Sequence, residues 1–113
     1  MDLQTADKAA RIRELNDAFR KTFSGGKVVM TASVAQLPSD VQAMAIRRVA
    51  TFDAFTPDND PHGEHDFGSF ELAGRKFYWK VDAYDAKLEF GSEDPSDPTK
   101  TTRVLTLMLA SDY

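Results

Sequence analysis

The residues best suited to chemistry lie between positions 58 and 66, where two histidines stand among carboxylates. His62 and His65 are three residues apart, and the acids around them are Asp58, Asp60, Glu64 and Asp66. Imidazole nitrogens and carboxylate oxygens bind zinc and other divalent cations, so both histidines, with Asp58 and Asp60, are candidate metal ligands. A calcium loop is excluded because Ser69 stands where that loop requires a glutamate. In the alternative interpretation, the carboxylates stabilise turns by accepting backbone N–H bonds, and no cofactor is bound.

The same segment offers groups for acid–base catalysis. His65 can act as a general base, and Asp66 or Glu64 can orient it, which makes these three residues the candidate catalytic groups. A metal-independent nuclease needs little more than such a base, an acid and cations on the phosphate. The sequence has no nucleophile elbow, no phosphate-binding loop, no G-x-G-x-x-G and no H-E-x-x-H. We therefore favour a non-enzymatic protein and keep a small hydrolase or nuclease as the alternative.

A second candidate site is residues 75–80, where cations and aromatic side chains are interleaved. Single-strand binders stack bases on aromatic rings and place Lys or Arg against phosphates. If the segment is a strand, however, Trp79 faces the core, and only Tyr78 remains as an outward platform beside Lys80. Acids on that face would pair with its lysines. Binding of single-stranded nucleic acid is therefore an alternative that we do not favour.

Composition restricts the class of protein. With 113 residues, of which 42% are hydrophobic and 28% charged, the chain has the size and balance of one globular domain. The absence of cysteine excludes disulfides, zinc ribbons and a thiol nucleophile. A net charge of -4 argues against bulk attraction to nucleic acid or to an anionic membrane, and no apolar run approaches the roughly 18 residues of a membrane helix. We expect a cytoplasmic protein, either a monomer or a homodimer.

Two helices are expected in the first half of the chain. An apolar stripe predicts a helix over residues 5–23, and residues 27–33 are β-branched and apolar enough to form a strand. Ser39 and Gln42 have the spacing of a capping box, which predicts the start of a helix over residues 39–52. The buried stripe of this second helix is expected to consist of Val41, Met44, Ala45, Val49 and Phe52.

The second half of the chain is expected to be a loop over residues 53–66 and a strand meander over 67–110. Alternating residues on either side of Ala73 and Gly74 predict a hairpin, and Leu88 and Phe90 extend a third strand. Residues 101–109 read as a last strand, although their spacing also fits a helix. The expected fold is α+β, an antiparallel sheet of four or five strands with the two N-terminal helices packed on one face. Whether residues 27–33 join this sheet stays open.

Four stretches of the chain resemble a known family. They are residues 56–61 (TPDNDP), 63–68 (GEHDFG), 77–85 (FYWKVDAYD) and 101–113 (TTRVLTLMLASDY). They are similar to small bacterial proteins catalogued as domain of unknown function 3768, although His62 stands where the family pattern has tyrosine. The resemblance implies a bacterial, mostly alphaproteobacterial, origin and a frequent association with mobile elements. It implies no established activity.

These observations together predict a non-enzymatic module that binds a protein partner. The predicted binding surface consists of the loop at residues 58–67 and an acidic loop at 93–97, which can steer a basic partner. The link of the resembling family to mobile elements points to a DNA-handling or host-defence protein as that partner. The candidate binding residues are Asp58, Asn59, Asp60, Glu64, His65, Tyr78, Lys80, Glu93 and Asp94.

Overall fold

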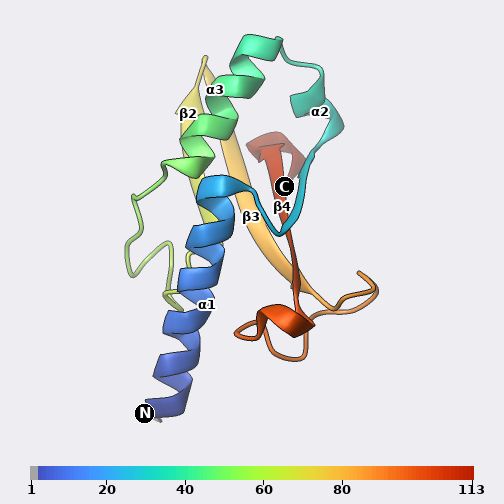
Figure 1. Cartoon of the computed structure of the whole chain (residues 1–113). Coiled ribbons are helices and arrows are strands. Elements are labelled where there is room, and N and C mark those ends of the chain that lie inside the picture. The colour runs from blue at the N-terminus through green and yellow to red at the C-terminus, as the bar shows by residue number, and fades with distance from the viewer. Residues whose placement is uncertain (1–2) are drawn as a thin grey trace.

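Helices cover one face of a small sheet (Figure 1). A computed structural model describes residues 3–113, with side chains for residues 7–113. The elements in chain order are α1 (Leu3–Thr22), β1 (Gly26–Met30), α2 (Ala32–Ala35), α3 (Ser39–Ala50), β2 (Phe67–Leu72), β3 (Arg75–Tyr84), η1 (Pro98–Lys100), β4 (Thr102–Leu109) and η2 (Ala110–Asp112). No helix among these described residues is long and apolar enough to cross a membrane.

The sheet is mixed, not purely antiparallel as expected. Within residues 3–113 its order is β1-β4-β3-β2, in which β1 runs parallel to β4 and the other neighbours are antiparallel. The predicted α+β class and the predicted β2–β3 hairpin are confirmed. The correction concerns β1, which does join the sheet. Its parallel pairing is possible because α2, α3, β2 and β3 all lie between β1 and β4 in the chain and form the long connection that parallel strands require.

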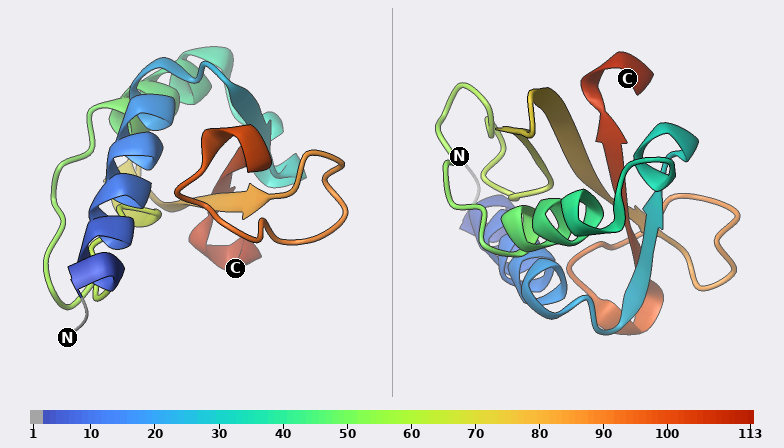
Figure 2. Two further views of the ribbon diagram at one scale, coloured as in Figure 1. Left: turned by 60° about the horizontal axis from the view of Figure 1, so that its bottom comes forward. Right: turned by 90° about the horizontal axis from the view of Figure 1, so that it is seen from above.

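The core lies between the sheet and the helices α1 and α3, which both lie on the same side of it (Figure 2). Alternate residues of β3 and β4 point into it, and α1 contributes Phe19 while α3 contributes Ala45 and Val49. Trp79 is completely buried, and the rings of Phe52 and Phe55 pack edge-on against its indole at 5.5 and 6.1 Å. The expectation that Trp79 is a core residue is confirmed. Burial of this apolar surface is the main force that holds the helices to the sheet.

The predicted third strand through Leu88 and Phe90 is wrong. β3 ends at Tyr84, and only one isolated bridge, Tyr84 to Gly91, continues the pairing beyond it. The chain turns because Asp85 accepts two hydrogen bonds: its carbonyl oxygen from the N–H of Leu88, and its carboxylate from the N–H of Glu89. An aspartate that bonds backbone groups just ahead of it favours a turn over a strand. Leu88 and Phe90 are consequently exposed, not buried.

The second helical region also differs in detail. β1 ends at Met30, and residues 32–35, expected at the end of that strand and in the following link, form the short helix α2. The capping box is wrong, because the N-cap of α3 is Pro38, which has no N–H to donate to Gln42, and Gln42 donates its side-chain N–H groups to the carbonyl oxygens of Ala35 and Leu37. Met44 is 45% exposed and does not belong to the buried stripe.

The segment at residues 101–109, whose spacing fitted both a strand and a helix, is the strand β4.

A close contact in the core yields a first prediction. Gly68 lies directly opposite Trp79 in the β2–β3 ladder, and a Cβ at this position would overlap with the indole. We expect Gly68→Ala to lower the free energy of unfolding by about 1–3 kcal/mol, the usual cost of overpacking. Urea denaturation measures the change. Ser69→Ala, at the exposed neighbouring position, is the control and should stay within about 0.5 kcal/mol of the wild type. Equal stability of both variants would contradict this contact.

Candidate functional site

Arg20 of α1 is the centre of a buried polar cluster. Its side chain is 2% exposed, and its Nη1 donates to the carbonyl oxygens of Val49 and Phe52, each at 2.8 Å. Val49 lies in the last turn of α3 and Phe52 lies just beyond its end, where carbonyl groups run out of helical N–H partners; the N–H of Phe52 also donates to Val49. Arg20 thus caps α3 from the neighbouring helix, where a cation also complements the helix dipole.

The charge of Arg20 is balanced by Asp17 and by aromatic rings. Nη2 lies 3.0 Å from Oδ1 of Asp17, one turn earlier on α1. The guanidinium carbon lies 5.4 Å from the ring centre of Phe55 and 5.2 Å from that of Trp79, within the range of cation–π attraction. A buried charge is tolerated when it is paired and hydrogen-bonded, and both Nη groups meet that condition, whereas the buried Nε has no partner among the described residues.

His65 is attached to the same cluster through Asp17. Its Nδ1 lies 2.9 Å from Oδ1 of Asp17, and its ring stacks on Phe55 with the ring centres 3.7 Å apart. On the other side, Nε2 lies 3.6 Å from Oδ2 of Asp60, whose side chain is 6% exposed and also accepts the backbone N–H of His65. Both ring nitrogens therefore face carboxylates. The arrangement fastens the loop at residues 53–66 to α1, whereas a general base needs a nitrogen that faces a substrate.

Glu64 and Asp66, the predicted orienting residues, are the sequence neighbours of His65 but make other contacts. Glu64 accepts a hydrogen bond from the amide of Asn16 at its backbone carbonyl, and the carbonyl of Asp66 accepts the N–H of Val81. Within the described side chains, no hydrogen bond joins His65 to the carboxylate of either residue. Burial raises the pKa of both carboxyl groups, and their mutual repulsion adds to the shift at Glu64. The groups that orient His65 are Asp17 and Asp60.

The candidate metal ligands are only partly brought together. Asp60 and His65 are neighbours, but Asp58 and His62 lie on the exposed surface of the loop. Among the residues that the structure describes, no three His, Asp or Glu side chains are arranged to hold a metal ion. Asn59 has a local role, because its side chain accepts the N–H of Thr56 and donates to the carbonyl of Ala54. This agrees with the interpretation in which polar loop residues stabilise turns.

The candidate residues on the sheet already have partners. The ring of Tyr78 packs against Phe67 and Tyr113, with ring centres 5.3 Å apart in both pairs. Lys80 forms an ion pair of 2.9 Å with Asp82, and this hydrogen bond raises the pKa of the lysine. A stacking platform for bases would need an exposed ring with free cations beside it. Tyr78 is only half-buried and Lys76 Nζ lies 5.4 Å from its ring centre, but the ring is already packed against Phe67 and Tyr113.

The acidic loop lies away from the histidine cluster. Glu93 forms an exposed ion pair of 3.2 Å with Lys100. Asp94 accepts hydrogen bonds from the N–H and the hydroxyl of Ser96, which lower the pKa of its carboxyl group. Asp94 therefore keeps its negative charge to a lower pH than an isolated aspartate does.

Sequence reasoning missed the residues of α1 that build the site. Besides Asp17 and Arg20, these are Arg13, which donates to the carbonyl of Gly63, and Asn16, which is buried. A signal was present, because these polar residues recur at helical spacing beside the apolar stripe. Such a pattern normally indicates a solvated face. Only the fold shows that a loop lies against it.

The capping role of Arg20 gives the second prediction. Lysine keeps the charge but lacks the planar fork that reaches the carbonyls of Val49 and Phe52 and the carboxylate of Asp17. We expect Arg20→Lys to lower the free energy of unfolding by about 2–4 kcal/mol and to speed hydrogen exchange in residues 52–65. The matched control is Lys21→Arg, which makes the reverse change at the next, exposed position. If both variants were equally stable, the cap would contribute nothing.

The raised pKa of Glu64 gives the third prediction. Because burial raises this pKa above its ordinary value of 4.5, the folded state holds the proton more tightly than the unfolded chain does. Ionisation of Glu64 at neutral pH therefore favours unfolding, and Glu64→Gln should raise the free energy of unfolding there. The advantage should disappear as the pH falls below 4.5, where both states of the wild type are protonated. Urea titrations at several pH values measure it.

Glu71→Gln serves as the control for this experiment, because Glu71 is an exposed carboxylate on β2. This variant should follow the wild type at every pH. A gain for Glu64→Gln that persisted at low pH would show that packing, not ionisation, was the cause.

Most of the chain matches one known protein family. Residues 30–112 match the family described as "Protein of unknown function (DUF3768)". Comparison with curated proteins and with solved structures finds no match. The matched range contains the loop at residues 53–66 and all of β2, β3 and β4. The resemblance noted in the sequence is thereby confirmed, and the chain belongs to this family of proteins of unknown function.

Proposed function

We propose that the protein is a non-enzymatic module that binds a protein partner through residues 83–92, here named the Phe90 turn. The observation that carries the proposal is the exposure of Phe90, which is 71% exposed in the turn that follows β3. The turn extends beyond the sheet, away from the helices (Figure 2). Exposed aromatic residues that can enter a pocket on a partner are the commonest anchors of protein interfaces.

The Phe90 turn is ordered before any partner binds. The N–H of Asp85 donates to the carbonyl of Phe90 at 2.8 Å, and the N–H of Ser92 donates to the carbonyl of Ala83 at 3.0 Å. The carboxylate of Asp85 also accepts the N–H of Glu89. An anchor that is held in place loses little conformational entropy on binding, which favours affinity. A turn that only exposes Phe90 to solvent would not need these hydrogen bonds.

The charges around the turn indicate the chemistry of the partner. Lys87 is the only cation between positions 85 and 97, and the acids there are Asp85, Glu89, Glu93, Asp94 and Asp97. The complementary surface is an apolar pocket with a basic rim, and the charges speed the encounter more than they add to affinity. Basic surfaces are typical of DNA-handling proteins, so we place the partner in that class. An association with mobile elements forms part of this proposal.

The geometry of the other candidate residues supports binding over catalysis. Both ring nitrogens of His65 face carboxylates, those of Asp17 and Asp60, which weakens the hydrolase or nuclease alternative. Tyr78 and Lys80 are engaged within the sheet face, which weakens the alternative of single-stranded nucleic-acid binding. Of the binding surface expected from the sequence, the acidic residues Glu93 and Asp94 are retained beside the Phe90 turn.

The fourth prediction tests the anchor. Tagged wild-type protein, purified from its own host, should retain a stoichiometric partner, and biolayer interferometry with that partner gives the affinity. We expect Phe90→Ser to weaken binding by about tenfold or more, as for an interface hot spot. The free energy of unfolding should stay within about 0.5 kcal/mol of the wild type, because Phe90 makes little contact with the core.

Tyr113→Ser is the matched control, since Tyr113 is also an exposed aromatic residue but lies outside the turn. This variant should bind with wild-type affinity. Full retention of the partner by Phe90→Ser would refute the proposal. So would a preparation that carries no partner and cleaves RNA or DNA with a dependence on His65.

A further inference from the structure

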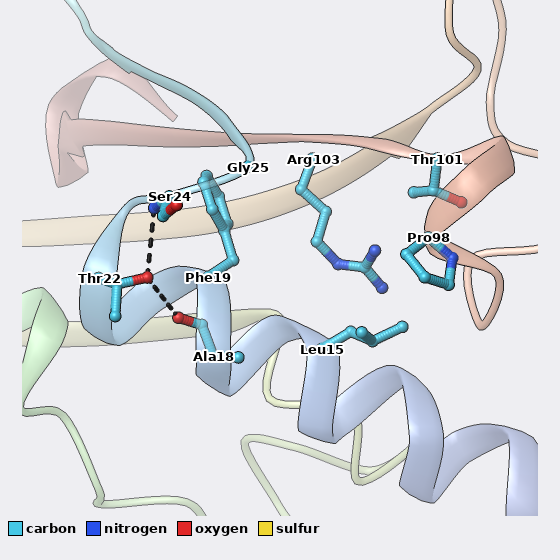
Figure 3. A pocket seen from close by; sticks show the side chains of 9 residues that line it. All are labelled: Leu15, Ala18, Phe19, Thr22, Ser24, Gly25, Pro98, Thr101 and Arg103. Carbon is cyan, nitrogen blue, oxygen red and sulfur yellow. Dashed lines mark hydrogen bonds between the residues drawn. The ribbon is translucent and has the colours of Figure 1, made fainter.

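A pocket of about 310 Å³ lies between α1, η1 and the start of β4, apart from both the histidine cluster and the Phe90 turn. Figure 3 shows the side chains around it, with the guanidinium of Arg103 directed into the space between Leu15 and Pro98. Its apolar wall is formed by Leu15, Ala18, Phe19 and Pro98, and its polar wall by Thr22, Ser24, Thr101 and Arg103. The volume is at the small end of the range for ligand sites.

Arg103 is an unusual residue for the position it occupies. It lies on β4 in the alternating series that faces the helices, with Leu105 and Leu107, and its side chain is 6% exposed. Nε donates to Oδ1 of Asn16 and Nη2 donates to the carbonyl of Pro95, both at 2.6 Å. These two bonds fix the plane of the guanidinium. Arginine stays charged in proteins, so a positive charge is held here in a fixed orientation.

The charge of Arg103 has no direct counter-ion in the described part of the chain. Both of its hydrogen-bond acceptors are neutral, and no described carboxylate lies within 4.0 Å of it. Arg11 is a further cation nearby, and Glu64 is the acid whose field reaches Arg103. Burial and Arg11 lower the pKa of Arg103, whereas Glu64 raises it. Nη1 donates no hydrogen bond to the described residues, so its two N–H groups are unused, and Arg103 is one of the residues that line the pocket.

A buried cation without a carboxylate partner is costly unless something compensates it. Arg20 shows how the same fold compensates such a charge internally, through the carboxylate of Asp17 and the carbonyls of Val49 and Phe52, although its Nε has no partner among the described residues. At Arg103 the internal partners satisfy only Nε and Nη2. The guanidinium points into the pocket (Figure 3) and has unused N–H groups, so an anion from solution can complete the arrangement.

We propose that this pocket binds a small organic carboxylate, with its charged end on Arg103 and its apolar body against Leu15 and Phe19. The apolar wall favours an anion that carries a hydrocarbon part over a bare inorganic ion. The last turn of α1 also lines the pocket, and its carbonyl end is partially negative, which disfavours a doubly charged phosphate. This site is independent of the Phe90 turn and of its proposed partner.

Ala18 allows the pocket to be filled without disturbing the core. Its side chain is exposed on α1 and lines the pocket, and leucine there keeps the helix propensity high. Ala10→Leu makes the same chemical change on the same helix but outside the pocket, so it is the matched control. Arg103→Gln removes the charge, and its circular dichroism spectrum and urea midpoint establish whether it is folded.

The probes are benzoate, the uncharged isostere benzamide, and inorganic phosphate, each titrated into the full chain. The readout is the set of NMR resonances of Arg103 Nε–H and of the amides of Ser24, Gly25 and Thr101. Benzoate should shift these resonances saturably, whereas benzamide and phosphate should not. Ala18→Leu should weaken benzoate binding at least about tenfold, and Ala10→Leu should bind as the wild type does.

Several outcomes would overturn the proposal. No saturable shift with benzoate would remove the site, and equal shifts with benzamide would show that Arg103 does not select an anion. Binding of phosphate in preference to benzoate would mean that the ligand class is wrong. Unchanged binding by Ala18→Leu, or by a folded Arg103→Gln, would place the benzoate elsewhere on the protein.

Discussion

The fold depends on the burial of one charged group, the guanidinium of Arg20. A cation in the core must find acceptors there, and the ones it finds are the terminal carbonyls of α3 and the carboxylate of Asp17. These bonds fix α1 relative to α3, and Phe55 and Trp79 pack against the same group. Because Asp17 also bonds His65, the position of the 53–66 loop follows from the position of Arg20. A loop without helices or strands thus has a defined conformation.

A second buried contact connects the other irregular segment to the same helix. Asn16 donates to the carbonyl of Glu64 in one loop and accepts from Arg103, which in turn donates to the carbonyl of Pro95 in the other. Both loops are therefore held by the polar face of α1 through groups that are almost inaccessible to water. Bonds of this kind specify a single arrangement because leaving any member unpaired is costly. The apolar core gives the stability, and these polar contacts determine where the loops lie.

The features that the sequence predicted correctly are those that local patterns determine. The β2–β3 hairpin and the core position of Trp79 follow from alternation within short segments. The sequence could not predict the parallel pairing of β1 with β4. This pairing joins residues that are distant in the chain, such as Val28 and Leu105, and no local pattern encodes such a contact. The same holds for the site, since Asp17 and His65 are 48 positions apart. Phe90 was misplaced because its alternation suggested a strand, whereas the hydrogen bonds of Asp85 impose a turn.

Arg20, Arg103 and Phe90 are among the described residues that depart from the general rule that charges are exposed and large apolar side chains are buried. The exception at Arg20 is explained within the chain, because its charge is paired and its bonds hold two helices together. Arg103 is explained only in part, since one end of its guanidinium lines a pocket without a counter-ion among the described residues. Phe90 has no internal explanation, because an ordered turn holds its ring in water. We propose that a molecule outside the chain supplies, at Arg103 and at Phe90, the contacts that the interior does not. The two features left unexplained are therefore the places where the protein is expected to meet a ligand and a partner.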